Sequence, residues 1–155
     1  MKATRAIQIL VEQKIPHEVL PYDVDGFVSA VEGANRLGIP AAAMFKTLIA
    51  RGERRGVVLA LVPGDETLSL RKLSQAIGDK RAEMVDPLEI SRLTGFVKGG
   101  VSPLGGRRSY PVYMDRSALH HPTVYVSAGV RGLAIAIAPS DLAQVTRATV
   151  VDLRD

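Results

Sequence analysis

Apolar residues recur at helical spacing in five segments of the chain. In residues 4–14, Ile7, Leu10 and Val11 fall on one face of a helix, and Thr4 stands where an N-terminal cap belongs. This spacing is typical of a helix that packs one apolar face against a core. The other expected helices are residues 29–38, 69–78, 87–95 and 140–145.

The ends of these segments carry residues that begin and end helices. Ser29 and Glu32 have the spacing of a capping box, in which each side chain bonds a free backbone N–H group of the other residue. Gly38 is expected to end the same helix, because glycine readily takes the left-handed conformation that follows a last helical turn. Ser140 is expected to cap the last helix.

Shorter apolar runs predict strands. Residues 44–64 hold two such runs joined by the charged turn "GERRG", which is typical of a β-hairpin. Helices and hairpins do not follow a regular strand–helix–strand order, so we expect a mixed α+β fold, a curled mixed sheet or partial barrel surrounded by helices. With no repeat or linker, residues 1–155 are expected to form a single domain. Further strands are expected at residues 17–22, 82–86, 110–114, 123–129, 132–138 and 148–153.

One charged residue interrupts the first strand of the hairpin. Lys46 lies in "MFKTLIA", residues 44–50, where every other residue except Thr47 is apolar. Lysine is rarely buried without a partner, so two interpretations are open. Either Lys46 lies on an edge strand and extends its ammonium group into water, or a pocket holds it to bind a substrate carbonyl or phosphate. Composition and spacing alone favour the first interpretation.

Composition narrows the classes of function. The net charge of +4 is compatible with a nucleic-acid partner but is not diagnostic of one. The absence of cysteine excludes disulfides, thiolate metal sites and a cysteine nucleophile. No segment approaches the roughly 18 apolar residues of a membrane helix, and the N-terminal residues lack a signal-peptide core. We therefore expect a cytoplasmic enzyme or binding module that makes no contact with a membrane.

Two glycine-containing loops are candidate binding sites. The longer is "KGGVSPLGGRR", residues 98–108, whose backbone N–H groups are suited to an anion or a developing oxyanion. It lacks the ending of a phosphate-binding P-loop and the setting of a dinucleotide fingerprint, and a plain turn between strands remains an alternative. The second loop is "SAGVRG", residues 127–132, which on its own reads as a hairpin turn.

The usual hydrolytic machinery is missing. None of the three histidines lies three or four residues from another potential ligand on an expected helix, so we expect no metal and no cofactor. The sequence contains neither the glycine–serine–glycine elbow of a hydrolase nor paired carboxylates at a recognisable spacing. If the protein is an enzyme, its mechanism needs another source for the nucleophile.

Three motifs in order give a more specific indication: "FKTL" at residues 45–48, "GGVSPLG" at 99–105 and "VSAGVRGL" at 126–133. Together with the first helix and "SDL" at 140–142, they make nearly the whole chain resemble the YbaK/EbsC family. These are free-standing editing proteins related to the insertion domain of bacterial prolyl-tRNA synthetase. The "GGVSPLG" form is most similar to the Cys-tRNA(Pro) deacylases of the family.

The resemblance implies an aminoacyl-tRNA deacylase of the same curled mixed fold, with Lys46 as the essential residue. The family pattern also has an aromatic residue where this chain has Ser29, and Phe27 lies two residues earlier. The implied substrate-binding residues are Tyr22, Thr47, Gly99, Gly100, Val101, Ser102, Pro103, Gly105, Ser127, Ala128, Gly129 and Asp141.

The implied partners are the 3′ end of tRNA(Pro) and, transiently, prolyl-tRNA synthetase. The attacking group is either water or the thiol of the substrate itself, and the resemblance favours the thiol. Two alternatives stay open at this point: a deacylase for Ala-tRNA(Pro) or another aminoacyl-tRNA, and a non-catalytic module of the same fold that binds tRNA or the synthetase through Arg51, Arg54 and Arg55.

Overall fold

The computed structural model describes residues 3–155, so Met1 and Lys2 of the expected domain lie outside the described residues. The α-helices are α1 (Arg5–Glu12), α2 (Ala30–Leu37), α3 (Leu70–Ile77), α4 (Ile90–Thr94) and α5 (Pro139–Thr146). The short 3₁₀ helices are η1 (Ala41–Ala43), η2 (Pro87–Glu89) and η3 (Arg116–His120). The strands are β1 (His17–Pro21), β2 (Phe45–Gly52), β3 (Gly56–Pro63), β4 (Ala82–Met84), β5 (Val112–Asp115), β6 (Val124–Ser127), β7 (Leu133–Ile137) and β8 (Thr149–Val151).

Local capping explains where most helices begin and end. The Thr4 side chain accepts a hydrogen bond from the backbone N–H of Ile7, and Ser29 does the same for Glu32. Gly38 ends α2 in the left-handed conformation, at φ 71°. These expectations are confirmed. The cap expected at Ser140 is wrong: α5 begins one residue earlier, at Pro139, because proline is well suited to the first helical position.

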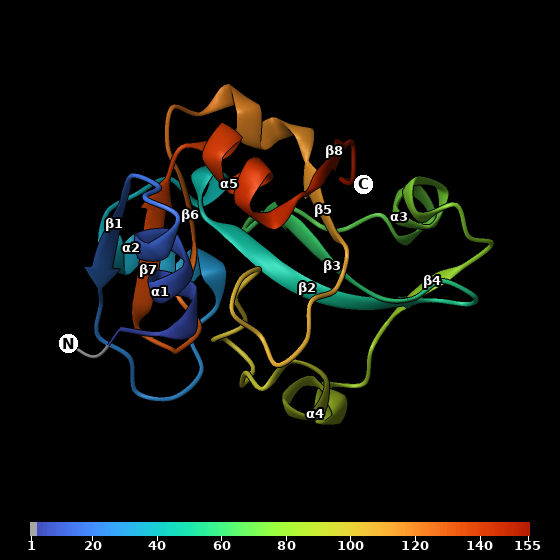
Figure 1. Ribbon diagram of the computed structural model, residues 1–155, viewed down its shortest axis with the longest axis horizontal. Helices are drawn as coiled ribbons and strands as arrows, with labels where there is room; N and C mark the ends of the chain where they lie inside the picture. Colours follow the sequence, from blue (N-terminus) through green and yellow to red (C-terminus); the bar gives the residue numbers. More distant parts are fainter. Residues whose placement is uncertain (1–2) are drawn as a thin grey trace.

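The larger sheet has the strand order β4-β2-β3-β5-β8. β2 and β3 pair antiparallel and form the expected hairpin, with Phe45 opposite Pro63 and Gly52 opposite Gly56. β4 pairs antiparallel with the end of β2, whereas β5 and β8 continue the sheet in parallel from β3. This sheet is therefore mixed, as expected (Figure 1).

The smaller sheet has the order β1-β7-β6, and all its pairs are antiparallel. A single parallel bridge between Met44 and Tyr125 joins it to the start of β2. The curled arrangement thus consists of two sheets that meet at one corner, and it does not close into a barrel (Figure 1).

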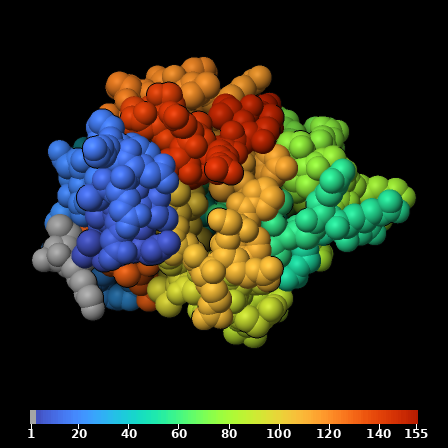
Figure 2. Space-filling view, in the orientation of Figure 1, coloured from blue at the N-terminus to red at the C-terminus, as the bar shows by residue number. Residues whose placement is uncertain are grey.

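The main core lies where the two sheets and the helices α1, α4 and α5 meet. Its members include Leu10 of α1, Phe45 of β2, Ile135 of β7 and Leu142 of α5, all of which are fully or almost fully buried. A second core lies on the other face of the larger sheet, where α3 covers β2 and β3. The tip of the β2–β3 hairpin and β4 project from the end of the molecule opposite α1 (Figure 2).

Candidate active site at the open edge of strand β2

Strand β2 pairs with β3 along its whole length, but its other edge is only partly covered. β4 pairs with it only from Ala50 to Gly52, and the smaller sheet meets the chain only at Met44, just before β2 begins. The edge around Lys46 and Thr47 is therefore left open, and a pocket of about 480 Å³ lies beside it. Apolar wall residues of this pocket are Val28, Phe45, Leu48, Ile49, Val85, Ile90 and Val101.

Lys46 lines this pocket and is partly buried. Its ammonium nitrogen lies 3.5 Å from the carbonyl oxygen of Gly64, which is its one hydrogen-bond partner among residues 3–155. Within the same residues Lys46 takes part in no ion pair. A positive charge beside an apolar wall and without a countercharge attracts an anionic or strongly polar ligand.

Thr47 directs its backbone N–H and C=O groups to the same open edge. Its hydroxyl oxygen is buried and has no hydrogen-bond partner in the described part of the chain. The carbonyl oxygen of Ile49 accepts a bond from Val85 on the side away from β3. Because backbone groups alternate in direction along a strand, those of Thr47 also point to that open side. A buried hydroxyl without a partner costs about 1–3 kcal/mol.

Tyr22 forms part of the wall next to α2. Its ring lies against Gly33, where a Cβ atom would lie 3.4 Å from the phenol oxygen. Burial raises the pKa of Tyr22 above its ordinary value, so the phenol stays neutral at physiological pH. Tyr22 therefore lines the pocket as a neutral phenol, not a phenolate.

The glycine loop contributes to the pocket with only some of its residues. Gly99 and Val101 line the pocket. Gly100 is buried against the neighbouring loop, where a Cβ would lie 3.1 Å from the backbone nitrogen of Arg131. The remaining expected residues line a different hollow of about 380 Å³, next to α1 and α5; they are Ser102, Pro103 and Gly105.

Ser102 and Gly105 have structural contacts in that second position. The buried hydroxyl of Ser102 accepts a hydrogen bond from the backbone N–H of Leu104, which holds the turn. A Cβ on Gly105 would lie 2.6 Å from the backbone nitrogen of Ala6, so this glycine lets α1 approach the loop closely. Both residues fix the path of the loop that carries Gly99 and Val101 to the pocket.

The second predicted loop reaches the pocket at one residue. Ser127 lines the pocket, and its hydroxyl oxygen accepts a hydrogen bond from the backbone N–H of Gly129. Ala128 is fully buried, and Gly129 packs against the ring of Phe96. Asp141 lies in the first turn of α5 and is not among the residues that line the pocket.

At the rim of the pocket, the sequence singled out Phe27 but not Lys98 or Arg131. The ammonium nitrogen of Lys98 lies 4.9 Å from the centre of the Phe27 ring, a cation–π arrangement. The same ring rests against Gly99, where a Cβ would lie 2.9 Å from it. Arg131 fixes this part of the rim by donating a hydrogen bond to the carbonyl oxygen of Lys98. The signal was present, because Lys98 is the first residue of the glycine loop.

The described lining of the pocket lacks the side chains that usually act as a general base or bind a metal ion. Among the residues of the lining there is no histidine, aspartate or glutamate. The described residues also contain no group of three or more His, Cys, Asp or Glu side chains arranged to hold a metal ion. The pocket can orient and polarise a substrate through Lys46, Thr47 and backbone amides, but it offers no ordinary general base.

Comparison with known proteins decides the family. The family model for the aminoacyl-tRNA editing domain matches residues 26–145. The chain belongs to this family. The match includes the open edge of β2 and both loops that reach the pocket, so every lining residue except Tyr22 lies within the matched residues.

Individual relatives agree with the family. The chain is 34% identical over 144 residues to a protein of Enterococcus faecalis named "Putative Cys-tRNA(Pro)/Cys-tRNA(Cys) deacylase EbsC", covering 92% of this chain and 88% of that protein. It is 32% identical over 110 residues to a proline–tRNA ligase of Acidithiobacillus ferrooxidans, which is 71% of this chain and 19% of the ligase.

Solved structures show the same arrangement. A crystal structure described as "a putative trans-editing enzyme for prolyl tRNA synthetase" aligns with a TM-score of 0.86 and 29% identity, covering 100% of this chain and 98% of that one. The mixed α+β fold expected from the sequence is therefore confirmed, and this chain shares it with a solved protein described as an editing enzyme. No helix in the described residues is long and apolar enough to cross a membrane.

Proposed function

We propose that this protein hydrolyses the ester bond of mischarged Cys-tRNA(Pro) and so removes errors made by prolyl-tRNA synthetase. One observation carries the proposal: Lys46 is a cation without a countercharge at the open edge of β2, inside an aminoacyl-tRNA editing domain. Membership of the editing family supports aminoacyl-tRNA as the class of substrate. The relative named as a Cys-tRNA(Pro)/Cys-tRNA(Cys) deacylase suggests cysteine as the amino acid.

The need for such an enzyme follows from the limits of binding. A pocket that admits proline cannot strongly reject alanine, which is smaller, or cysteine, which is similar in size. One methylene group changes the binding free energy by only about 1–3 kcal/mol. A second site that hydrolyses the wrong product is the available solution, and it must act on the ester after the synthetase has released it.

The roles of the residues follow from their positions. Lys46 anchors the 3′-terminal adenosine or its phosphate, while Thr47, Tyr22 and Ser127 bond polar groups of the aminoacyl ester. The backbone at Gly99 and Val101 faces the same space. Residues of the two loops that lie behind the pocket hold these groups in place; they are Gly100, Ser102, Pro103, Gly105, Ala128 and Gly129. A binding role for Asp141 remains a prediction, since this residue lies outside the pocket lining.

The substrate thiol is the proposed nucleophile, because the lining contains no carboxylate or imidazole to activate water. The sulfur attacks the carbonyl carbon of its own ester, the C–O bond to the ribose breaks, and the thiol proton ends on the ribose oxygen. The cyclic thioester that forms is then opened by water, which yields free cysteine. A free thiol has a pKa near about 8.5, so some thiolate is present at neutral pH without a protein base.

The test is release of labelled cysteine from Cys-tRNA(Pro), with Pro-tRNA(Pro) as the substrate that must be spared. Lys46→Ala is expected to remove the activity. Lys14→Asn is the matched control: Lys14 is an exposed lysine outside the pocket with φ 57°, a conformation that asparagine tolerates. Binding of tRNA without release above the buffer rate would favour the non-catalytic module of the same fold.

The proposed function also includes a partner protein and a cellular location. The domain is small and only mildly basic, so tRNA(Pro) is selected with the help of prolyl-tRNA synthetase, which this protein meets transiently. It works in the cytoplasm, where tRNA is charged. Copurification of the two proteins in the presence of tRNA(Pro), compared with its absence, tests the association.

A further inference from the structure

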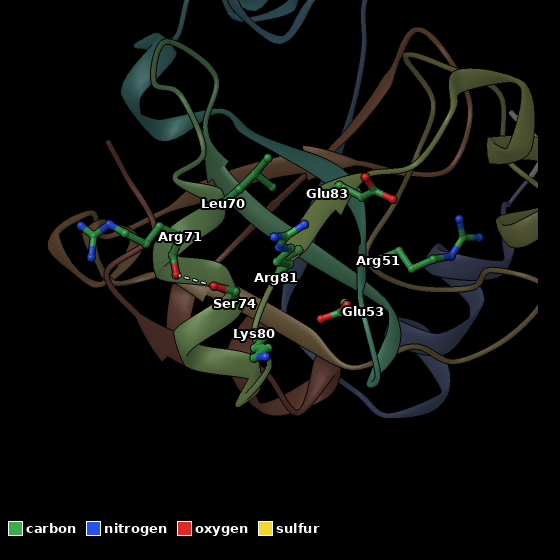
Figure 3. A pocket seen from close by; sticks show the side chains of 10 residues that line it. Arg51, Glu53, Leu70, Arg71, Ser74, Lys80, Arg81 and Glu83 are labelled. Atoms are coloured by element: carbon green, nitrogen blue, oxygen red, sulfur yellow. Dashed lines mark hydrogen bonds between the residues drawn. The ribbon is translucent and has the colours of Figure 1, made fainter.

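A second cleft, of about 570 Å³, lies between α3 and the edge formed by β2 and β4. β4 separates it from the pocket described above, because consecutive residues of a strand point to opposite faces: Glu83 lines the cleft and Met84 lines the pocket. Figure 3 shows Arg81 and Lys80 at the centre of this cleft, with Arg71 and Arg51 extending to opposite sides. We call it the basic cleft.

Three cations of the basic cleft have no countercharge. Arg71, Lys80 and Arg81 are exposed, and none of them takes part in an ion pair within residues 3–155. Arg51 differs, since its guanidinium lies 3.1 Å from the carboxylate of Glu89. Exposed cations that are not neutralised by their neighbours are available to a ligand of opposite charge.

The neighbouring hairpin turn adds to the same positive surface. Arg54 and Arg55 are exposed at this turn, beside Glu53 of the cleft. The carboxylate of Asp79 accepts hydrogen bonds from the backbone N–H groups of Arg54 and Arg55 and keeps its negative charge. Cations without an ion pair within residues 3–155 still outnumber the nearby carboxylates: the cations are Arg54, Arg55, Arg71, Lys80 and Arg81, and the carboxylates are Glu53, Asp79 and Glu83.

The kind of anion follows from the residues that are present. No aromatic side chain lines the basic cleft, so it has no platform on which a nucleic-acid base can stack. Exposed arginine and lysine side chains suit phosphate groups, which they contact without reading sequence. Lys46 of the pocket and Arg51 of the cleft are five residues apart on β2, so these two cations attach to the strand roughly 17 Å from each other. A short run of nucleotides spans such a distance.

We propose that the basic cleft binds the phosphate backbone of the tRNA acceptor arm while the aminoacylated 3′ end occupies the pocket. This inference rests on the proposed function for its choice of RNA. The cleft then supplies affinity and orientation that do not depend on base sequence, and the pocket supplies the chemistry. β4 lies between the two hollows and sets the point at which the RNA passes from one to the other.

The experiment compares the wild-type protein with the triple variant Arg71→Gln, Lys80→Gln, Arg81→Gln. Binding of uncharged tRNA(Pro) is measured by fluorescence anisotropy over a range of salt concentrations. Each lost single-strand phosphate contact lowers the slope of log K against log salt by about 0.7, so the triple variant should lose about 2. The matched control is Lys14→Asn with Arg147→Asn, two exposed cations distant from the cleft at positive φ; it should keep the wild-type slope to within about 0.7.

A second measurement separates the cleft from the pocket. The cysteinyl ester of adenosine is too short to reach the basic cleft, so its hydrolysis by the triple variant should equal that of the wild type. An unchanged salt slope, or equal loss of activity on this small ester, would overturn the role of the cleft. Loss of binding to prolyl-tRNA synthetase with normal tRNA binding would assign the cations to an acidic protein partner and overturn it too. Failure of the wild type to hydrolyse either substrate contradicts the proposed function, whereas the anisotropy result still decides whether the cleft binds RNA.

Discussion

The carbonyl oxygen of Gly64 lies 3.5 Å from the ammonium nitrogen of Lys46, and Gly64 occupies a position with no room for a side chain. A Cβ there would lie 2.8 Å from the Cβ of Ala30 and 3.0 Å from the carbonyl oxygen of Met44. The start of α2 is thereby packed against the end of the β2–β3 hairpin. The orientation of the proposed essential lysine thus depends on close packing between elements that are distant in sequence.

Gly64→Ala is expected to lower the stability of the protein and its activity together. The added methyl group must displace α2 or the hairpin, and such overpacking costs about 1–3 kcal/mol. Thermal unfolding followed by circular dichroism measures the change. Adding Ala30→Gly, which removes the nearest methyl group, should restore part of the stability, and an unchanged Tm in Gly64→Ala would contradict the packing argument.

Lys46→Ala is expected to abolish deacylation while the protein stays folded. The lysine makes one long hydrogen bond and no ion pair in the described residues, so its removal should leave the fold intact. Lys46→Arg should also be inactive, because a planar guanidinium does not replace a compact ammonium group in a narrow site. Near-normal turnover by a folded Lys46→Ala protein would rule out the assignment.

Cysteine should be released from tRNA(Pro) far faster than serine if the substrate thiol attacks its own ester. The two side chains are nearly equal in size, so the pocket cannot separate them strongly, whereas a thiol ionises far more readily than a hydroxyl group. The rate on Cys-tRNA(Pro) should also rise with pH toward the pKa of the thiol, after subtraction of spontaneous hydrolysis. Equal initial rates on the two substrates would indicate that water attacks.

Glu89→Gln is expected to lower the Tm more at pH 7 than at acidic pH, where Glu89 becomes protonated. The hydrogen-bonded guanidinium of Arg51 lowers the pKa of Glu89 below its ordinary value. A carboxyl group with a lowered pKa in the folded state adds stability above its unfolded pKa of about 4.3, and the added stability is lost as pH falls through the folded value. Glu12→Gln, at an exposed residue without an ion pair in the described chain, should show no such dependence.

Deacylation is expected to survive exhaustive chelation. The pocket lining contains no histidine or carboxylate that would hold a metal ion. Activity is measured on Cys-tRNA(Pro) after treatment with a chelator, and magnesium is then restored because it acts on the tRNA itself. Loss of activity that zinc restores and magnesium does not would show that a metal takes part.

Features that depend on neighbours in the chain could be read from the sequence. The cap at Ser29 and the end of α2 at Gly38 need only bonds within a few residues, and the "GERRG" turn joins strands that are adjacent in sequence. The family could be recognised for the same reason, because "FKTL" and the two loop motifs are continuous segments. Ser140 does not cap α5, because the preceding Pro139 takes the first helical position and Ala138 the cap position.

The position of each loop residue relative to the pocket was decided only by tertiary structure. Gly99 and Val101 reach the pocket, whereas Ser102 and Gly105 turn toward α1, which packs against the loop from nearly a hundred residues away in sequence. No local pattern records such a contact. Asp141 fits the family motif, but the course of α5 puts it outside the pocket lining.

The sequence by itself determined the helices, the hairpin, the family and the unusual lysine in an apolar strand. Tertiary structure alone decided that this lysine faces a pocket, because the edge of β2 stays open only where β4 stops at Ala50 and the smaller sheet stops at Met44. It also placed Arg71, near the start of α3, in the lining of the same cleft as Arg81 of the segment between α3 and β4. The physical reason is that strand pairing and helix packing join residues far apart in sequence, and their geometry depends on the whole core.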